Sequence, residues 1–285
     1  MLQKLPIEQL DKIANDIRED IIKMLEHAGS GHSAGPLGLA DIFAALYFDI
    51  LKYDPKKPDW NERDLFLLSN GHCVPVQYAA MARAGYFDRK ELMTLRQLGS
   101  RLQGHPERTK LPGLETTSGP LGSGLSQACG MALALRMDKQ QHRWVYVVMG
   151  DGEQDEGNVW EAAMLAGKYK LNNIIAITDR NNIQIDGPTE TVMPLGDLKA
   201  KWQAFGWHVL EINGNDVEAV IDACAMGRAI QEQPVMIIAH TIPGKGVDFM
   251  ENDFHWHGSP PNHEQAVKAL HELRTLGGKI RSEHE

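Results

Sequence analysis

The chain has 285 residues, 42% of them hydrophobic, and carries a formal net charge of −9 at pH 7. This length is ample for a buried core, and the acidic balance argues against nucleic acid as a partner, because nucleic-acid binding needs a basic face. The longest apolar runs are strand-sized, far short of a membrane span, and Met1 to Leu10 contains no apolar signal-peptide core. Three widely separated cysteines suggest neither a disulfide framework nor a metal site (Cys73, Cys129 and Cys224). We therefore expect a cytoplasmic protein that does not bind a membrane.

The first half of the chain combines helices with glycine-rich loops. Apolar periodicity predicts these elements in chain order: helix Ile7 to His27, helix Leu37 to Leu51, strand Leu65 to Leu68, helix Val76 to Ala84 and helix Lys90 to Leu98. Gly29 or Gly31 would end the first helix. Gly99 to Ser123 has no clear periodicity, and a loop of that length inside a compact domain is usually functional.

The second half alternates regularly between short apolar runs and helical patterns. The predicted order is helix Gly124 to Asp138, strand Val145 to Met149, helix Asn158 to Lys170, strand Ile174 to Thr178, helix Leu198 to Phe205, strand His208 to Ile212, helix Val217 to Ile230, strand Val235 to Ala239 and helix His263 to Leu276. Such alternation predicts an α/β fold in which a parallel β-sheet is sandwiched between helices. No linker or repeat divides the chain, so we expect one domain over residues 1–285.

An acidic loop, Gly150 to Gly157, follows one predicted strand, and Asn181 follows the next strand along the chain. Ligands bind at the carboxyl ends of strands in open α/β sheets. The carboxylate of Asp151 and the amide oxygen of Asn181 would suit a hard divalent cation. The sequence therefore predicts a metal site at this edge of the sheet.

The acidity of this loop also indicates which kind of phosphate ligand binds there. Four carboxylates in the loop would repel a polyphosphate, whereas a divalent ion beside Asp151 converts repulsion into attraction. Neither the phosphate-loop pattern with its lysine nor the third glycine of the dinucleotide pattern is present. We infer a magnesium-bridged diphosphate rather than a directly bound nucleotide. Asp186-Gly187 is predicted to be a turn.

These motifs resemble those of transketolases. Gly150-Asp151-Gly152 through Asn181-Asn182 is similar to the thiamine diphosphate motif of that family. Four further segments match in order: Ser30-Gly31-His32, Leu68-Ser69-Asn70-Gly71-His72, Gly104-His105-Pro106-Glu107 with Thr117-Ser118-Gly119-Pro120-Leu121-Gly122, and Trp256-His257-Gly258. The resemblance implies the thiamine diphosphate-binding fold, with thiamine diphosphate and Mg²⁺ (or Ca²⁺ or Mn²⁺) as cofactors.

The resemblance also implies where these cofactors bind. Asp151, Asn181 and the backbone carbonyl of Ile183 would ligate the metal. The other cofactor-binding positions are His72, Gly119, Pro120, Leu121, Gly150, Gly152 and Glu153. Gly152 would let a backbone N–H approach a phosphate, and the Gly119 to Gly122 segment precedes a helix N-terminus, which favours anions.

Four of the twelve histidines stand in glycine-flanked loops: His32, His72, His105 and His257. By resemblance, His32 and His257 contact the sugar hydroxyls and the reaction centre, His105 lies near the donor's C1 and C2 oxygens, and His72 lies near the diphosphate. Imidazole suits these roles because it donates, accepts or shuttles protons near neutral pH. His255 could compete with His257 for its role, but the Trp256-His257-Gly258 match favours His257. We expect the histidines at 27, 142, 208, 240 and 263 to be structural.

Glu156 and Glu161 flank a predicted helix start, where acidic groups also occur for ordinary reasons. The resemblance places Glu156 in an acidic cluster that links two active sites across a dimer, with a weaker expectation for Glu161. Lys245, between two glycines, is a candidate phosphate contact.

The resemblance leaves one required group outside this chain. Transketolases place the glutamate that activates the cofactor in a second domain, and this sequence ends near where that domain would begin. We therefore expect the N-terminal subunit of a split transketolase, active only with a separate C-terminal partner, in an α2β2 heterotetramer. The implied reaction moves a two-carbon ketol unit from a ketose phosphate to an aldose, with the pentose phosphate pathway as the default setting.

Three alternatives stay open at this point. One is a subunit of a 1-deoxyxylulose-5-phosphate synthase or of another split thiamine enzyme. The second is a non-catalytic partner subunit that keeps the fold without the cofactor. The third is a magnesium-dependent nucleotide hydrolase, which the missing phosphate-loop lysine disfavours.

Overall fold

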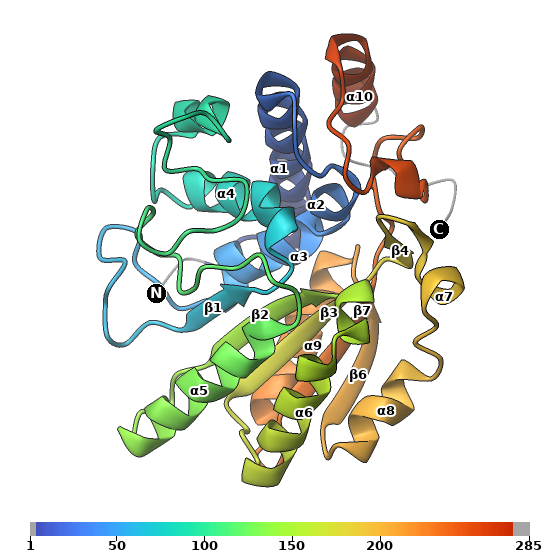
Figure 1. Ribbon diagram of the computed structural model, residues 1–285. Helices are drawn as coiled ribbons and strands as arrows, with labels where there is room; N and C mark the ends of the chain where they lie inside the picture. Colours follow the sequence, from blue (N-terminus) through green and yellow to red (C-terminus); the bar gives the residue numbers. More distant parts are fainter. Residues whose placement is uncertain (1–3, 276–285) are drawn as a thin grey trace.

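Figure 1 shows the computed structural model of the protein, which describes residues 4–275. Its central layer is a five-stranded sheet in the order β1-β2-β3-β7-β6, with every neighbouring pair parallel. The strands are β1 (Leu65–Leu68), β2 (Val145–Gly150), β3 (Ile174–Arg180), β6 (His208–Asn213) and β7 (Val235–His240). The predicted parallel α/β architecture is confirmed.

The strands form a central layer because successive apolar side chains point to opposite faces of the sheet. On β2, Val145 and Val147 join one hydrophobic cluster, and Tyr146 and Val148 join the other. All four side chains are fully buried, and each such burial contributes about 1.5–3 kcal/mol. Strands that are apolar on both faces need helices on both faces, which is why the sheet is enclosed.

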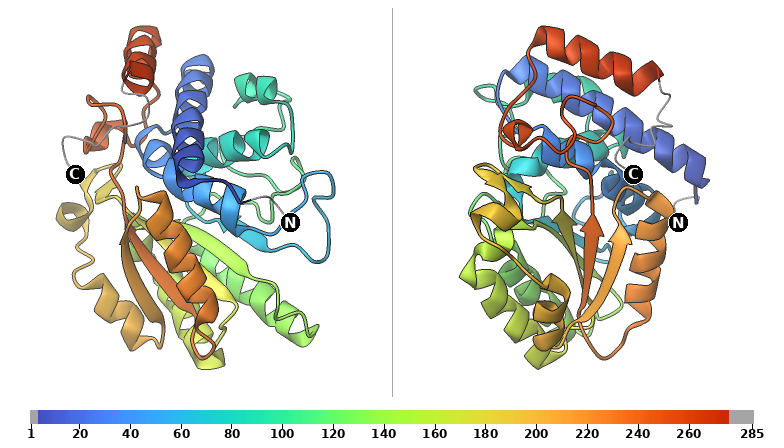
Figure 2. Two further views of the ribbon diagram at one scale, coloured as in Figure 1. Left: turned by 180° about the vertical axis from the view of Figure 1, so that it is seen from behind. Right: turned by 90° about the vertical axis from the view of Figure 1, so that its right-hand side faces the viewer.

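Helices cover the two faces, as the side view in Figure 2 shows. One face packs against α5 (Ser123–Met137), α6 (Gly157–Tyr169) and α8 (Leu198–Ala204). The other packs against α1 (Ile7–Ala28), α3 (Ala40–Ala45) and α9 (Val217–Ala229). The helices α4 (Val74–Arg83) and α10 (His263–Thr275) pack beside α1. Most of these bounds lie within two residues of the predicted ones.

The end of α1 shows why glycine is needed there. Gly29 adopts φ 60°, a left-handed conformation, and its N–H bonds to the carbonyls of Leu25 and Glu26. Glycine reaches this conformation without the Cβ penalty that other residues meet. Of the two predicted stops, Gly29 is therefore the one that ends the helix.

Two predicted helices were wrong in kind. Instead of one helix over Leu37 to Leu51, the chain forms α2 (Ala34–Gly38), α3 and a π-helical turn, Leu46–Ile50, in succession. Instead of a helix over Lys90 to Leu98, a 3-10 helix covers Arg89–Thr94 and then stops, because Leu95 is extended and Arg96 adopts φ 61°. The first segment buries all its leucines and the second buries Leu92 and Leu95 but not Leu98, and periodicity detects such burial without distinguishing the helix type.

The sequence reasoning also missed the small elements that follow β3. Strands β4 (Ile183–Gln184) and β5 (Gly187–Pro188) form an antiparallel hairpin, and the helix α7 (Thr189–Val192) follows directly. The predicted Asp186-Gly187 turn lies where this hairpin reverses. The loop from Gly99 onward contains no helix or strand before α5, as predicted. Two-residue strands carry too little apolar pattern to be seen in a sequence.

No helix among the described residues is both long and apolar enough to cross a membrane. Residues 4–275 are organised around the one large sheet, and the single-domain assignment of residues 1–285 stays a prediction. Helix α10 matches the helix predicted over His263 to Leu276. The last residue of that predicted helix, Leu276, lies outside the described residues.

Candidate active site at the carboxyl edge of the sheet

The carboxyl ends of β2, β3 and β7 lie side by side and deliver their loops to one edge of the sheet. Gly150 at the end of β2 pairs with Asp179, and Arg180 at the end of β3 pairs with His240. Strand β3 continues two residues beyond the predicted end, so Asp179 and Arg180 belong to it. Ligands of parallel α/β proteins bind at this edge.

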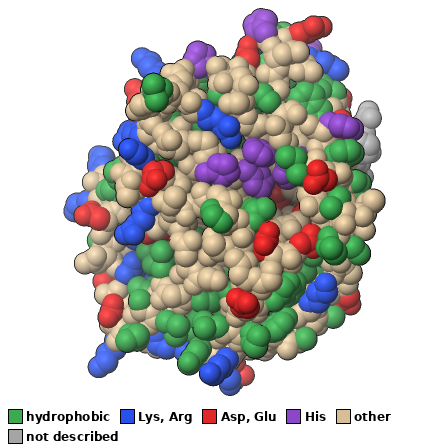
Figure 3. Space-filling view, in the orientation of Figure 1, with side chains coloured by type: hydrophobic (Ala, Val, Ile, Leu, Met, Phe, Trp, Pro, Cys, Tyr) green, Lys and Arg blue, Asp and Glu red, His purple; other side chains and the backbone are tan. Residues whose placement is uncertain are grey.

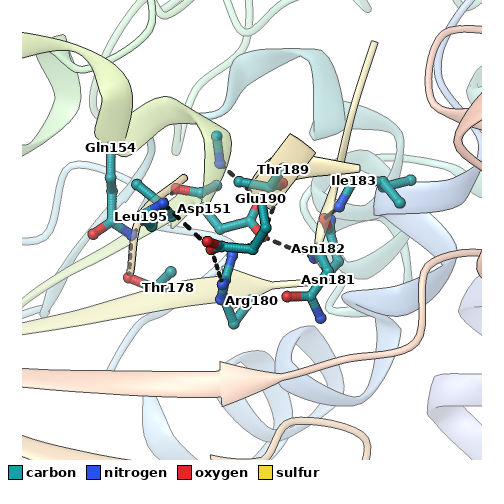
Figure 4. A network of polar contacts seen from close by, with 12 residues as sticks. Asp151, Gln154, Thr178, Arg180, Asn181, Asn182, Ile183, Thr189, Glu190 and Leu195 are labelled. Carbon is teal, nitrogen blue, oxygen red and sulfur yellow. Dashed lines mark hydrogen bonds and ion pairs between the residues drawn. The ribbon is translucent and has the colours of Figure 1, made fainter. Parts of the chain in front are cut away.

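Asp151 is the central acid of this edge and is 1% exposed. One carboxylate oxygen, Oδ1, accepts a hydrogen bond from the N–H of Gly152 at 2.7 Å. The other, Oδ2, accepts from the N–H of Asn182 at 2.8 Å and from Arg180 Nη1 at 3.0 Å (Figure 4). Burial raises the pKa of Asp151, and the Arg180 guanidinium opposes that rise. The Gly152 N–H, expected to approach a phosphate, here bonds to the acid beside it.

Asn181 is held by the neighbouring residues of β3. Its Nδ2 donates to Asp179 Oδ2 at 2.8 Å, and its Oδ1 accepts from the N–H of Ile183 at 3.0 Å. Thr241, which follows β7, donates from its hydroxyl to Asp179 Oδ1. Burial, with the nearby Asp151 charge adding to it, raises the pKa of Asp179 to about 7. The amide is thereby fixed with its oxygen on the side of the Ile183 backbone.

The donors gathered here fit a magnesium ion in their chemistry. One carboxylate, one amide oxygen and a backbone carbonyl at the start of β4 are hard oxygen donors of the kind Mg²⁺ takes, together with substrate phosphates. Asn70, at the end of β1, lies beside Gly150, and its buried Oδ1 has no hydrogen-bond partner in the protein. Among residues 4–275, no three His, Cys, Asp or Glu side chains are grouped to hold a metal. The predicted ligand set differs from such a group, since it contains one acid, Asp151, with an amide and a backbone carbonyl.

Glu153, predicted to bind the cofactor, has both carboxylate oxygens engaged by the protein. Oε1 accepts from the N–H of Gly122 at 2.6 Å and from the Ser69 hydroxyl, and Oε2 accepts from the N–H of Gly150 at 2.9 Å. The residue is 3% exposed, and burial raises its pKa. Its contacts tie together the ends of β1 and β2 and the loop before α5.

That loop needs glycine at its last position. Gly122 adopts φ 81°, and an added Cβ would lie 2.0 Å from Asn158 Oδ1. The segment from Gly119 to Gly122 leads into α5, whose N-cap is Gly122. Gly119 lies against the ring of His105, while Pro120 is exposed and Leu121 is half-buried. The structure therefore places the predicted loop at a helix N-terminus beside one of the predicted histidines.

Three of the four predicted histidines form a cluster, defined here as His32, His72 and His257. Their ring centroids are 4.8, 5.1 and 5.6 Å apart. They come from the loop after α1, a 3-10 turn after β1 and the segment that precedes α10. Figure 3 shows histidine side chains gathered at the centre of one face of the molecule. Residues from opposite ends of the sequence thus meet in one site.

Burial determines the charge of this cluster. It lowers the pKa of His32 to about 4, with His257, Arg96 and His105 adding to the effect. Burial likewise holds the pKa of His72 well below the usual value and lowers that of His257. The rings are therefore neutral at pH 7. The Nδ1 atoms of His32 and His257 are buried without a protein partner, so both face inward with unused hydrogen-bonding capacity.

The cluster lies close to the β4–β5 hairpin, which follows Asn181. A side chain added at Gly258 would meet Ile185 of the hairpin at 3.5 Å and His32 at 3.9 Å. His105 stands apart from the three-ring cluster, and burial and the Arg96 guanidinium lower its pKa. His255 points elsewhere: its Nδ1 lies 2.6 Å from Asp253 Oδ1, and its side chain is 75% exposed. Of the two competing histidines, His257 is the one in the cluster.

The remaining predicted residues lie around this centre. Glu156 is exposed at the N-cap of α6, and Glu161 is exposed one turn later. Lys245 is buried in the loop after β7. Their functional roles stay predictions.

Sequence reasoning missed Arg180 and Asp179, which bond to the predicted metal ligands, and Arg96, which lies against Gly104. A signal for the first two was present. Charged residues at positions 179 and 180 directly follow an apolar strand and precede Asn181. Charged groups at the end of a buried strand are costly unless they have partners.

Three kinds of similarity agree with this geometry. Residues 9–278 match the family described as "Transketolase, thiamine diphosphate binding domain". An apulose-4-phosphate transketolase subunit of Phocaeicola vulgatus is 41% identical over 98% of both chains. The 6-deoxy-6-sulfo-D-fructose transketolase subunit of a Clostridium species is 42% identical over 93% of this chain and 96% of its own.

Solved structures give the same result for the fold. The transketolase of Campylobacter jejuni superimposes with a TM-score of 0.88 at 36% identity, over 94% of this chain and 43% of that one. A Leishmania mexicana transketolase gives a TM-score of 0.86 at 35% identity, over 95% of this chain and 42% of that one. This chain thus spans about two fifths of these solved enzymes.

Proposed function

The chain belongs to the transketolase family as its thiamine diphosphate-binding part, and from this premise we propose that it is the N-terminal subunit of a split, Mg²⁺-dependent transketolase. The supporting observation is that Asp151 and Asn181 are held at neighbouring strand ends while three neutral histidines meet at the same edge. A metal–diphosphate group and a sugar need such adjoining sites. Family membership favours this function over a nucleotide hydrolase and over a 1-deoxyxylulose-5-phosphate synthase.

In this proposal Asp151, Asn181 and the Ile183 carbonyl would hold Mg²⁺, whose charge would attract the diphosphate. When bound, thiamine diphosphate supplies the nucleophilic carbon and the electron sink of the reaction. The protein's part at this end is positioning, since all the polar groups named here are already ordered by hydrogen bonds. Glu153 contributes by holding the Gly122 and Gly150 loops together rather than by contacting the cofactor with its carboxylate.

The histidines act at the sugar end. His32 and His257 are neutral at pH 7, and in this proposal their rings bind the hydroxyl and carbonyl oxygens of a ketose. His105 serves the donor oxygens, and His72 connects the sugar end to the diphosphate end. General acid–base assistance of this kind contributes about 10²–10⁴-fold in rate.

Relatives whose names describe them as transketolase subunits imply a second subunit for those proteins, and we propose the same for this chain, in an α2β2 assembly. The helices α5 and α6 carry an exposed apolar face consisting of Met137, Met164, Leu165 and Tyr169. Apolar side chains gather over these helices in Figure 3. Such a face is typical of an interaction surface. Glu156 is exposed at the start of α6, the helix that carries three of these side chains.

The names of two relatives guide the choice of substrate. One carries a 4-phosphate and the other a 6-sulfo group in the name of its sugar. We therefore propose a ketose with an anionic terminal group, of which pentose phosphates are one example. The cytoplasm is proposed as the location, since the three cysteines are buried free thiols.

Replacing Asp151 tests the metal site. We expect Asp151→Ala to weaken Mg²⁺-dependent binding of thiamine diphosphate by at least about 100-fold, because the metal loses its one carboxylate ligand. The measurement is calorimetry on the full chain, both by itself and with its partner subunit. Asp155→Ala, an exposed acid of the same loop, is the matched control and should bind as the wild type does. Normal affinity in Asp151→Ala would show that the ligand assignment is wrong.

A second test addresses the partner. Ketol transfer by the purified chain should be undetectable and should appear when the C-terminal subunit is added, with ketoses of different terminal groups as donors. Full turnover by the chain alone would refute the split-enzyme proposal.

A further inference from the structure

Arg180, at the end of β3, lies between two acids. Its Nη1 is 3.0 Å from Asp151 Oδ2, and its Nη2 is 2.5 Å from Glu190 Oε1. The side chains of Arg180 and Asp151 are 10% and 2% exposed, whereas that of Glu190 is 44% exposed. One guanidinium thus joins the buried proposed metal ligand to an acid at the surface (Figure 4).

Glu190 is built to receive the guanidinium. It belongs to α7 and also accepts hydrogen bonds from the N–H groups of Leu195 and Gly196 at 3.3 and 3.4 Å. The hydrogen bond from Arg180 is the largest cause that lowers the pKa of Glu190, so this acid is charged at pH 7. Arg180 therefore has a second anionic partner if its contact with Asp151 is weakened.

The charges of this network set the conditions for metal binding. A cation 3.0 Å from Asp151 already offsets the negative charge that Mg²⁺ would use. A second cation on the same carboxylate is repelled by the first, and burial strengthens that repulsion because the local dielectric constant is low. A diphosphate changes this balance, since its negative charges are enough to attract both the metal and the guanidinium.

Given the proposed cofactor function, we propose that Arg180 is an internal counterion of Asp151 that suppresses metal binding in the absence of the diphosphate. Metal and diphosphate then bind together rather than in independent steps. Glu190 takes a larger share of the guanidinium when the metal contacts Asp151. Because coupling between two ligands is reciprocal, the diphosphate gains as much from the metal as the metal gains from it.

The experiment is a titration of the full chain with Mn²⁺, followed by electron paramagnetic resonance, with and without thiamine diphosphate. In Arg180→Gln, we expect Mn²⁺ alone to bind at least about 5-fold more tightly than in the wild type, and the effect of thiamine diphosphate on Mn²⁺ affinity to shrink by a similar factor. Arg180→Lys keeps the charge and should stay close to the wild type. A purely structural role predicts the opposite sign, namely weaker binding in Arg180→Gln.

Glu190→Gln provides an independent test at a more exposed position. With its second partner neutralised, the guanidinium is left to Asp151, so Mn²⁺ alone should bind about 2–5-fold more weakly. This variant also decides the question if Arg180→Gln does not fold, which circular dichroism will show. Unchanged or tighter Mn²⁺ binding in Glu190→Gln would overturn the proposal.

The counterion proposal would also be overturned if Arg180→Gln bound Mn²⁺ no more tightly than the wild type. The same holds if neither Arg180→Gln nor the wild type bound Mn²⁺ in the absence of thiamine diphosphate. Asp151→Asn separates this failure from failure of the cofactor site itself. If Asp151→Asn still binds Mn²⁺ and thiamine diphosphate normally, the metal site is elsewhere. If Asp151→Asn loses binding while Arg180→Gln gains nothing, the site stands and only the counterion role is lost.

Discussion

The two ends of the active-site edge differ in how their polar groups are satisfied. At the proposed metal end, Asp151, Asn181 and Glu153 each bond to protein donors or acceptors, although the buried Oδ1 of the nearby Asn70 has no protein partner. In the histidine cluster, the Nδ1 atoms of His32 and His257 are buried and have no protein partner. Buried polar groups are almost always hydrogen-bonded, and the exceptions need an explanation. The proposed metal ligands are thus held by protein groups, whereas two of the three clustered histidines each keep a buried nitrogen without a protein partner.

The largest expected effect is on the rate of ketol transfer, and it distinguishes the histidine cluster from the proposed metal site. His257→Ala should lower kcat for ketol transfer by about 10²–10⁴-fold, because a general acid–base group is lost, and leave thiamine diphosphate affinity within about 2-fold. Steady-state kinetics of the reconstituted enzyme and calorimetry give the two values. His255→Ala is the neighbouring control and should keep full activity. If His257→Ala lost as much affinity for thiamine diphosphate as it lost in rate, the histidine cluster and the proposed metal site could not be assigned separate roles.

A smaller effect is expected for stability at the metal end. Glu153→Gln replaces one carboxylate oxygen by an NH₂ group that faces backbone N–H donors, and a buried donor without an acceptor costs about 1–3 kcal/mol. We expect that loss in the free energy of unfolding, measured with urea. Glu161→Gln, an exposed acid on α6, should change stability by less than about 0.5 kcal/mol. Equal stability of both variants would contradict the role assigned to Glu153.

The smallest effect concerns pH. The folded-state pKa of His32 is about 4, below its ordinary value of 6.5, so the unfolded chain binds more protons between these values and stability falls as pH drops through that window. His32 should account for about 1 kcal/mol of the stability lost between pH 7 and pH 5.5, after allowance for its partial exposure. Between pH 7 and pH 5.5, the free energy of unfolding of His32→Gln, measured with urea, should fall by about 1 kcal/mol less than that of the wild type. If the two proteins lost the same stability between these pH values, the pH dependence would come from residues other than His32.

Much of the fold followed from apolar patterning. Each strand of the large sheet was placed within two residues of its true ends, because short runs of Val, Ile and Leu leave a clear signal, which is strongest where both faces of the strand are buried. The helix over Lys90 to Leu98 was wrong for a related reason: its buried leucines mimic a helix, but Arg96 in a left-handed conformation breaks the segment. Patterning reports burial more reliably than backbone conformation.

By itself, the sequence determined the parallel sheet, the edge at which the site lies, and the chemistry that oxygen donors and histidines offer there. These depend on residue type and local order, which the chain carries directly. Only the tertiary structure decided that the rings of three of these histidines lie within 5.6 Å of one another, that His255 instead contacts Asp253, and that Arg180 pairs with Asp151. Such pairings depend on side-chain direction and on burial by distant segments, and the spacing of residues along a chain specifies neither.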